Sequence, residues 1–176
     1  MKVIFRTTES FLESVRTDLI RPHPFAHERV GFITVRAAQG ADHLVVLAQD
    51  YHPLADGEYL RDRSVGAMMG QEAIRKALDL ALLNPVGIFH IHMHTLPGRR
   101  LWFSHIDLRE QQRFVPDFFK VRPNMPHGAI VLSPQSAAGL AWLGPTEIVP
   151  IAEFNFVGTQ IKIVRSSGDG STDFYV

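Results

Sequence analysis

The period of the apolar positions changes several times along the chain, and each period predicts an element. In residues 8–20, Phe11, Val15 and Leu19 recur at four-residue spacing, which predicts an amphipathic helix opened by a Thr or Ser cap. Two further helices are expected by the same reasoning, over residues 66–85, where an Asn-Pro pair ends the pattern, and over residues 104–119.

Runs rich in β-branched and apolar residues predict strands between and after these helices. The runs 28–38 and 42–51 lie on either side of a Gly-containing turn, which predicts a hairpin. The other expected strands are 2–5, 86–94, 127–133, 139–143, 147–157 and 160–164. Because hairpins alternate with helices, we expect an α/β or α+β domain with a mixed, mostly antiparallel sheet flanked by helices.

Two loops stand out between these elements. Residues 50–65 are polar and turn-rich, which predicts a loop that could fold over a site. A second loop contains the sequence PGRRLWF, in which Arg99 and Arg100 precede Trp102 and Phe103. These aromatic side chains either grip an extended peptide substrate or close the core behind the next helix, and the sequence leaves both open.

Composition limits the classes of protein that fit. The 176 residues are 45% hydrophobic and carry a formal net charge of +0, so we expect one domain over 1–165 with a flexible tail over 166–176, and no nucleic-acid or membrane partner. The absence of Cys excludes disulfides and Cys-bound metals and fits a reducing compartment. The N-terminal apolar stretch is too short for a signal peptide, and we expect a cytoplasmic protein.

Histidines are concentrated in one segment of the chain. His90, His92 and His94 occupy alternate positions of an expected strand, so their side chains project from the same face. Two such imidazoles near a strand end can hold one metal ion, and Asp107, one turn into the following helix, can supply a third ligand. Three protein ligands leave one position for water, which is the pattern of a catalytic zinc site.

A catalytic site of this kind also needs a base. Glu28 lies just before an expected strand, three residues ahead of Gly31, where its carboxylate could accept a proton from water without binding the metal. Glu58 is the rival base, although its polar loop favours a solvated role. Ser104 and Asp107 also have the spacing of a helix N-cap and an acidic N3 residue, and this role is compatible with a role in the site.

The order Glu-x-x-Gly, His-x-His and Ser-x-x-Asp resembles the JAB/MPN metalloprotease family, also called JAMM, over residues of about 25–145. The resemblance implies a single JAB/MPN-like domain, of the cytidine-deaminase-like fold. It also implies a zinc isopeptidase that removes ubiquitin or a ubiquitin-like protein, and that works beside enzymes of a conjugation pathway.

The resemblance also implies a role for each site residue. His92, His94 and Asp107 would bind Zn²⁺, and Glu28 would act as general base and then protonate the leaving amine. Ser104 would steady the oxyanion by a hydrogen bond.

The spacing between the histidines and the serine departs from the family. Residues 95–103 intervene between His94 and Ser104, which is longer than the family usually has, and the pair His90 and His92 would make the spacing longer still. His92 is a ligand in either register. We take His92 and His94 as the pair and keep His90 as the alternative ligand. The residues alone also admit another divalent ion.

The leading interpretation is a zinc-dependent deubiquitinase-like isopeptidase that hydrolyses the amide or isopeptide bond after the C-terminal Gly of a ubiquitin-like protein. A second interpretation keeps the zinc but makes the chain a peptidase that processes a sulfur-carrier or ubiquitin-like precursor. A third is a non-catalytic MPN-type scaffold, which the presence of every candidate ligand disfavours.

Overall fold

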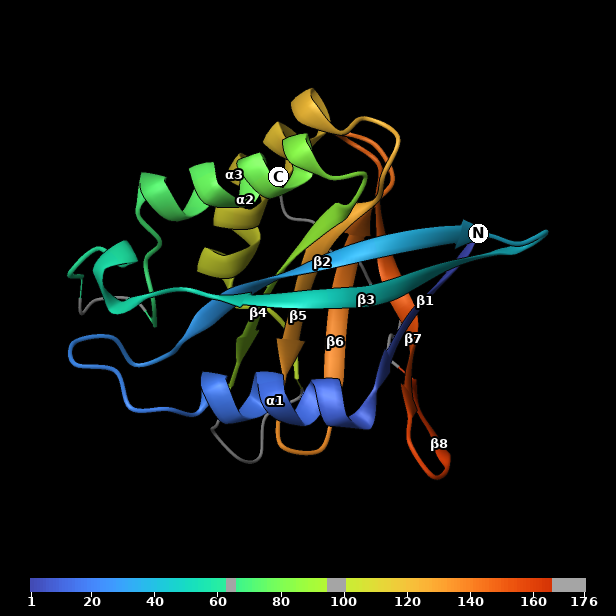
Figure 1. The fold of residues 1–176 in the computed structure, drawn as a ribbon, viewed down its shortest axis with the longest axis horizontal. Helices are drawn as coiled ribbons and strands as arrows, with labels where there is room; N and C mark the ends of the chain where they lie inside the picture. The colour runs from blue at the N-terminus through green and yellow to red at the C-terminus, as the bar shows by residue number, and fades with distance from the viewer. Residues whose placement is uncertain (63–65, 95–100, 166–176) are drawn as a thin grey trace.

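The computed structural model describes residues 1–62, 66–94 and 101–165 (Figure 1). Its elements in chain order are β1 (Lys2–Thr8), α1 (Glu9–Leu19), β2 (Val30–Gln39), β3 (His43–Pro53), the 3₁₀ turn η1 (Asp56–Glu58), α2 (Gln71–Leu83), β4 (Gly87–Met93), α3 (His105–Val121), β5 (His127–Leu132), β6 (Ala137–Trp142), β7 (Ile148–Val157) and β8 (Ile161–Arg165). The expected tail 166–176 and the loop arginines Arg99 and Arg100 lie outside the described residues.

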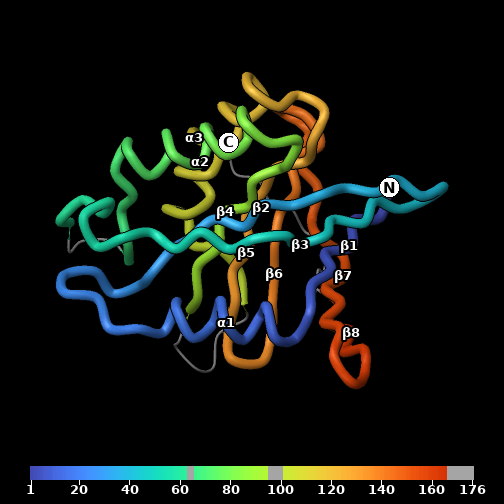
Figure 2. Tube along the Cα trace, in the orientation of Figure 1, coloured from blue at the N-terminus to red at the C-terminus, as the bar shows by residue number. Residues whose placement is uncertain are grey.

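The strands form one sheet that closes on itself. Their order is β1-β3-β2-β4-β5-β6-β7-β8, and β1 pairs with β7 as well as with β3, so that seven strands complete a barrel and β8 extends β7 outside it (Figures 1 and 2). β1 runs parallel to both of its neighbours, and β4 runs parallel to β5. The remaining pairings are antiparallel.

The expected fold class, an α/β or α+β JAB/MPN-like domain whose sheet is flanked by helices, is therefore wrong. The described part of the chain is mostly β, with three α-helices around a closed sheet. The closure depends on Val3, which is in register with Leu44 of β3 on one side and Ile151 of β7 on the other. Periodicity indicates which residues of a strand face inward, but it does not indicate which strands become neighbours.

Two apolar cores lie on the two faces of the sheet. The inner core combines inward-facing strand residues such as Phe89 and Phe154 with one face of α1, whose Val15 is fully buried. The outer core lies beneath α2 and α3 and includes Phe118 of α3 and Trp142 of β6. Figure 1 shows α1 on one side of the molecule and α2 and α3 on the other. The outer core is the one that borders the candidate site.

Two local features differ from the sequence patterns. The helix expected over 66–85 begins only at Gln71, because Met69 forms an isolated bridge with Tyr59 and keeps the preceding segment extended. The expected loop 50–65 starts later than its polarity indicates, since β3 continues to Pro53. Within the described ranges, no helix is long and apolar enough to cross a membrane.

Candidate metal centre

β4 places the histidines at the centre of the sheet. It pairs with β2 on one side and β5 on the other, and all seven of its residues are buried. His92 lies opposite Val30 of β2 and Val131 of β5 and is 1% exposed. His94 follows the end of the strand, where its N–H donates to the carbonyl of Leu132. The Nε2 atoms of His92 and His94 lie 3.2 Å apart.

The first turn of α3 brings Asp107 to the same point. Ser104 caps the helix: its Oγ accepts the N–H of Asp107 at 3.1 Å, and the Oδ2 atom of Asp107 accepts the N–H of Ser104 at 2.8 Å. The same Oδ2 atom lies 3.6 Å from Nε2 of His92 and 3.9 Å from Nε2 of His94. The capping box therefore fixes a carboxylate oxygen beside the two imidazoles.

Glu28 approaches from the loop before β2. The N–H groups of His27 and Glu28 both donate to the carbonyl of Gly66, and Oε1 of Glu28 lies 3.9 Å from Nε2 of His94. One ligand atom from each of Glu28, His92 and His94 lies within 4.8 Å of the others, so this group can hold a metal ion. Four of the five site residues expected from the sequence thus converge, and Ser104 caps the helix that carries Asp107.

A buried arginine that the sequence did not single out holds the loop that carries Glu28. Arg29 is 4% exposed, and its guanidinium donates to the carbonyls of Arg21 and Pro22 and to Oδ1 of Asp56. These bonds tie the chain before β2 to the turn after β3. Arg29 follows Glu28 directly, so they fix the backbone from which the carboxylate projects.

Gly31, the glycine of the Glu-x-x-Gly pattern, has a packing explanation. A Cβ atom at this position would lie 2.4 Å from the ring of Tyr51, which crosses the strand there. The Tyr51 hydroxyl donates to Asp18 of α1 at 2.6 Å, so the ring cannot move away freely. Gly31 lets the Tyr51 ring lie directly on β2.

The electrostatics of the group favour an ionised Asp107 and a neutral His94. Burial acts to raise the pKa of Asp107, but the hydrogen bond and charge of His92, together with the bonds from Ser104, hold that pKa well below its usual range. Burial and the neighbouring His92 lower the pKa of His94. A neutral imidazole with a free lone pair and an ionised carboxylate are the forms that bind a metal.

The donor set and its spacing fit a small divalent cation. Four ligands at roughly 2.0–2.1 Å around a tetrahedral ion lie about 3.3 Å from one another. The distances of 3.2, 3.6 and 3.9 Å among His92, His94 and Asp107 are close to that value. Nδ1 of His92 is buried with no hydrogen-bond partner in the described part of the chain. A metal-binding imidazole usually has such an outer partner, so this centre departs from the common pattern.

His90, the alternative ligand, points to a different place. It is 6% exposed, its ring centroid lies 5.4 Å from that of His92, and it packs edge-on against Phe32 and Phe114. Burial, with a smaller contribution from His92, lowers the pKa of His90 to about 3. The metal-capable group contains Glu28, His92 and His94. Neither His90 nor Asp107 is part of it, although Oδ2 of Asp107 lies within 4 Å of both imidazoles.

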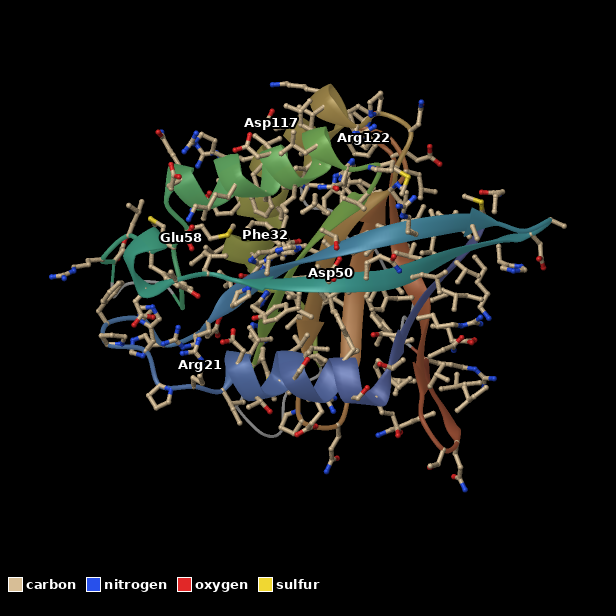
Figure 3. The ribbon with its side chains drawn as sticks, viewed as in Figure 1. Arg21, Phe32, Asp50, Glu58, Asp117 and Arg122 are labelled. Atoms are coloured by element: carbon tan, nitrogen blue, oxygen red, sulfur yellow. The ribbon has the colours of Figure 1, made fainter. Side chains whose placement is uncertain are left out.

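The rival base lies outside the centre. Glu58 forms an ion pair with Lys76 of α2 at 2.6 Å, and its second oxygen accepts the N–H of Ala55 (Figure 3). Its role is to join η1 to α2.

The loop aromatics divide between two environments: Phe103 is buried in the outer core beside His92, whereas Trp102 is 37% exposed and packs on Phe103.

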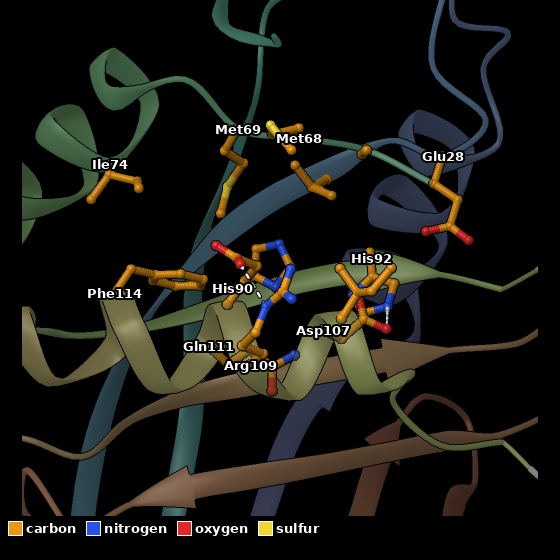
Figure 4. A pocket seen from close by; sticks show the side chains of 14 residues that line it. Glu28, Met68, Met69, Ile74, His90, His92, Asp107, Arg109, Gln111 and Phe114 are labelled. Carbon is orange, nitrogen blue, oxygen red and sulfur yellow. Dashed lines mark hydrogen bonds and ion pairs between the residues drawn. The ribbon is translucent and has the colours of Figure 1, made fainter. Parts of the chain in front are cut away.

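A cavity of about 110 Å³ opens beside the centre (Figure 4). Glu28, His92 and Asp107 lie at its edge, and it extends along α3 past the residues that follow Asp107. Met68 and Met69 also line this cavity. The centre therefore has a pocket beside it that can accept part of a substrate.

A scan against protein-family models finds no match to this chain, and a search of curated proteins finds no relative.

Proposed function

We propose that the protein is a zinc-dependent hydrolase that cleaves the amide or isopeptide bond after the C-terminal Gly of a ubiquitin-like protein. The observation that supports the proposal most is the convergence of His92, His94 and Asp107 on one point, with the carboxylate of Glu28 beside them. Imidazole nitrogens and carboxylate oxygens are ligands that zinc accepts, and three of them leave a position for water.

The two carboxylates differ in a way that supports different roles in this proposal. Asp107 is held by the capping box, which suits a ligand, because its oxygen cannot turn away. Glu28 lies on a loop and is 28% exposed, and its carboxylate lies 3.9 Å from Nε2 of His94. When bound, zinc lowers the pKa of a water molecule and polarises the scissile carbonyl. Glu28 then takes the proton of the water and delivers it to the leaving amine.

Ser104 supplies a donor for the oxyanion in this proposal. Its Oγ accepts the N–H of Asp107 and lies at the start of α3, next to the carboxylate of the metal centre. A positioned hydroxyl donor stabilises the negative charge that develops on the carbonyl oxygen. The substrate class itself rests on the resemblance of the motif residues to JAMM isopeptidases. Processing of a ubiquitin-like or sulfur-carrier precursor is the second candidate, since the same centre would cleave a linear Gly-X bond.

Metal analysis of the purified protein tests the centre. The parent and Glu28→Gln are expected to hold about one zinc ion per chain, whereas His92→Ala and Asp107→Asn lose it. Folding of all four proteins is checked by near-ultraviolet circular dichroism. A parent protein that binds no zinc when zinc is supplied would contradict the proposal.

Two substrates then separate the candidate functions. One is a ubiquitin-like domain fused through Gly-Gly to a reporter, and the other is the same domain joined to a lysine side chain by an isopeptide bond. The zinc-loaded parent is expected to cleave at least one of them, and Glu28→Gln neither. Preference for the isopeptide supports the leading function, and preference for the fusion supports precursor processing.

A further inference from the structure

The cavity beside the metal centre contains an unpaired polar side chain at its buried end. Gln111 is 1% exposed, and neither its Oε1 nor its Nε2 has a hydrogen-bond partner in the described part of the chain. Nδ1 of His90, which lines the same cavity, is also without one. An amide buried without partners is unfavourable, so such a group calls for an explanation.

The helix directs Gln111 toward the same side as the metal ligand. Asp107 and Gln111 are four residues apart in α3, and residues with this spacing lie on the same face of a helix. Both line the cavity, with Asp107 at the metal centre and Gln111 one turn further along (Figure 4). A substrate group that enters the cavity from the centre would therefore meet the Gln111 amide.

The remaining walls select for size and polarity. Met69, Ile74 and Phe114 are apolar, while Arg109 and Glu110 form an ion pair with each other at 3.2 Å. The cavity of about 110 Å³ is enough for a short side chain, because a water molecule takes roughly 30 Å³ in the liquid. A small group with an apolar stem and a polar tip fits these walls.

We infer that Gln111, with His90, forms a specificity subsite for a carboxamide, such as a Gln or Asn side chain. A carboxamide both donates and accepts, so it satisfies Oε1 and Nε2 of Gln111 together. A carboxylate would leave Oε1 unpaired, and an ammonium would leave Nε2 unpaired. This inference rests on the proposed function, in which Gly precedes the cleaved bond. The side chain in the cavity therefore comes from the leaving-group side.

Binding of small probes tests the subsite independently of catalysis. The side-chain amide signal of Gln111, identified as the one lost in Gln111→Leu, is followed by NMR in the full chain with and without zinc. Propionamide, propionate and 2-butanone are titrated in turn. Propionamide is expected to give a saturable shift, and the other two to bind at least about tenfold more weakly, because each leaves a buried polar atom unpaired. Gln112→Leu, at the exposed neighbouring position, is the matched control and keeps the preference.

Cleavage of matched fusions provides the second readout. Fusions that differ only in the residue after Gly-Gly, which is Gln, Glu or Leu, are compared by kcat/KM. The parent is expected to prefer Gln over Leu by roughly tenfold or more, and Gln111→Leu to lose this preference while still cleaving the Leu fusion. If propionamide fails to bind the parent selectively, the subsite is overturned whatever the cleavage result. If propionamide binds but neither the fusions nor the isopeptide-linked substrate is cleaved, the subsite stands and the proposed function fails.

Discussion

Nε2 of His92 and Nε2 of His94 face each other at 3.2 Å, although His92 lies inside β4 and His94 lies beyond its end. Two imidazole nitrogens at this distance have two options. One ring donates a proton to the other, or both lone pairs point at a shared cation. Because Asp107 lies within 4 Å of both nitrogens, the second option also satisfies the carboxylate.

Substitution of His94 and of His90 shows which of the two binds the metal together with His92. His94→Ala is expected to weaken zinc binding by more than the roughly 10–100-fold that loss of an outer partner costs, because it removes a direct ligand. His90→Ala is expected to stay within that range, since His90 lies outside the group. Competition with a chromophoric chelator measures both affinities. A larger loss in His90→Ala than in His94→Ala would reverse the assignment.

Gly66 offers a way to displace Glu28 without altering it. A Cβ atom at Gly66 would lie 2.6 Å from Oε2 of Glu28, and the end of a flexible side chain can move aside at little cost. Gly66→Ala is therefore expected to retain zinc and thermal stability but to lower kcat by at least tenfold, because general-base catalysis contributes roughly 10²–10⁴-fold. Gly57→Ala, where a Cβ meets no atom within 4 Å, is the matched control. Unchanged turnover in Gly66→Ala would argue against Glu28 as the base.

Arg29 is expected to act through the backbone beside Glu28. Arg29→Met keeps the buried stem but removes the donors to the carbonyls of Arg21 and Pro22 and to Oδ1 of Asp56. The loss of these three bonds is expected to cost at least about 1–3 kcal/mol of unfolding free energy, measured by urea titration. It is also expected to lower kcat more than zinc affinity, because Arg29 adjoins the base and not the ligands. Arg75→Met, at an exposed helix position, controls for the loss of one arginine.

The sequence predicted the local features of this protein better than its global arrangement. The ranges of α1, α3 and most strands follow from apolar spacing, and the Ser104 and Asp107 spacing predicted the observed helix cap. Closure of the sheet was missed, because the pairing of β1 with β7 joins residues about 150 positions apart without any local signal. The sequence identified the site residues that occur at the spacing of a motif. It did not identify Arg29 and Gln111, because only burial distinguishes them from surface residues of the same type.

The buried His127 is expected to make the folding stability depend on pH, independently of the metal. Its ring stacks on Phe118, Nδ1 accepts the N–H of Ile88 at 3.1 Å, and Nε2 donates to the carbonyl of Arg122 at 3.0 Å. These partners fix a neutral tautomer. Burial lowers the pKa of His127 from 6.5 to about 4, despite the bond to Arg122, which acts to raise it.

The sign of the pH effect follows from this shift. Between pH 6.5 and 4 the unfolded chain binds a proton at His127 that the folded chain does not, so stability falls as the pH is lowered through this window. The full effect is about 3 kcal/mol, and it is absent above pH 6.5. Urea titrations of zinc-free His127→Phe and parent protein at pH 7, 5.5 and 4.5 measure it. His127→Phe is expected to be less stable at pH 7, because Ile88 loses its acceptor, but to lose less stability on acidification. If the stabilities of the parent and of His127→Phe change in parallel with pH, then His127 has the same pKa in the folded and unfolded chains. That outcome would contradict the prediction.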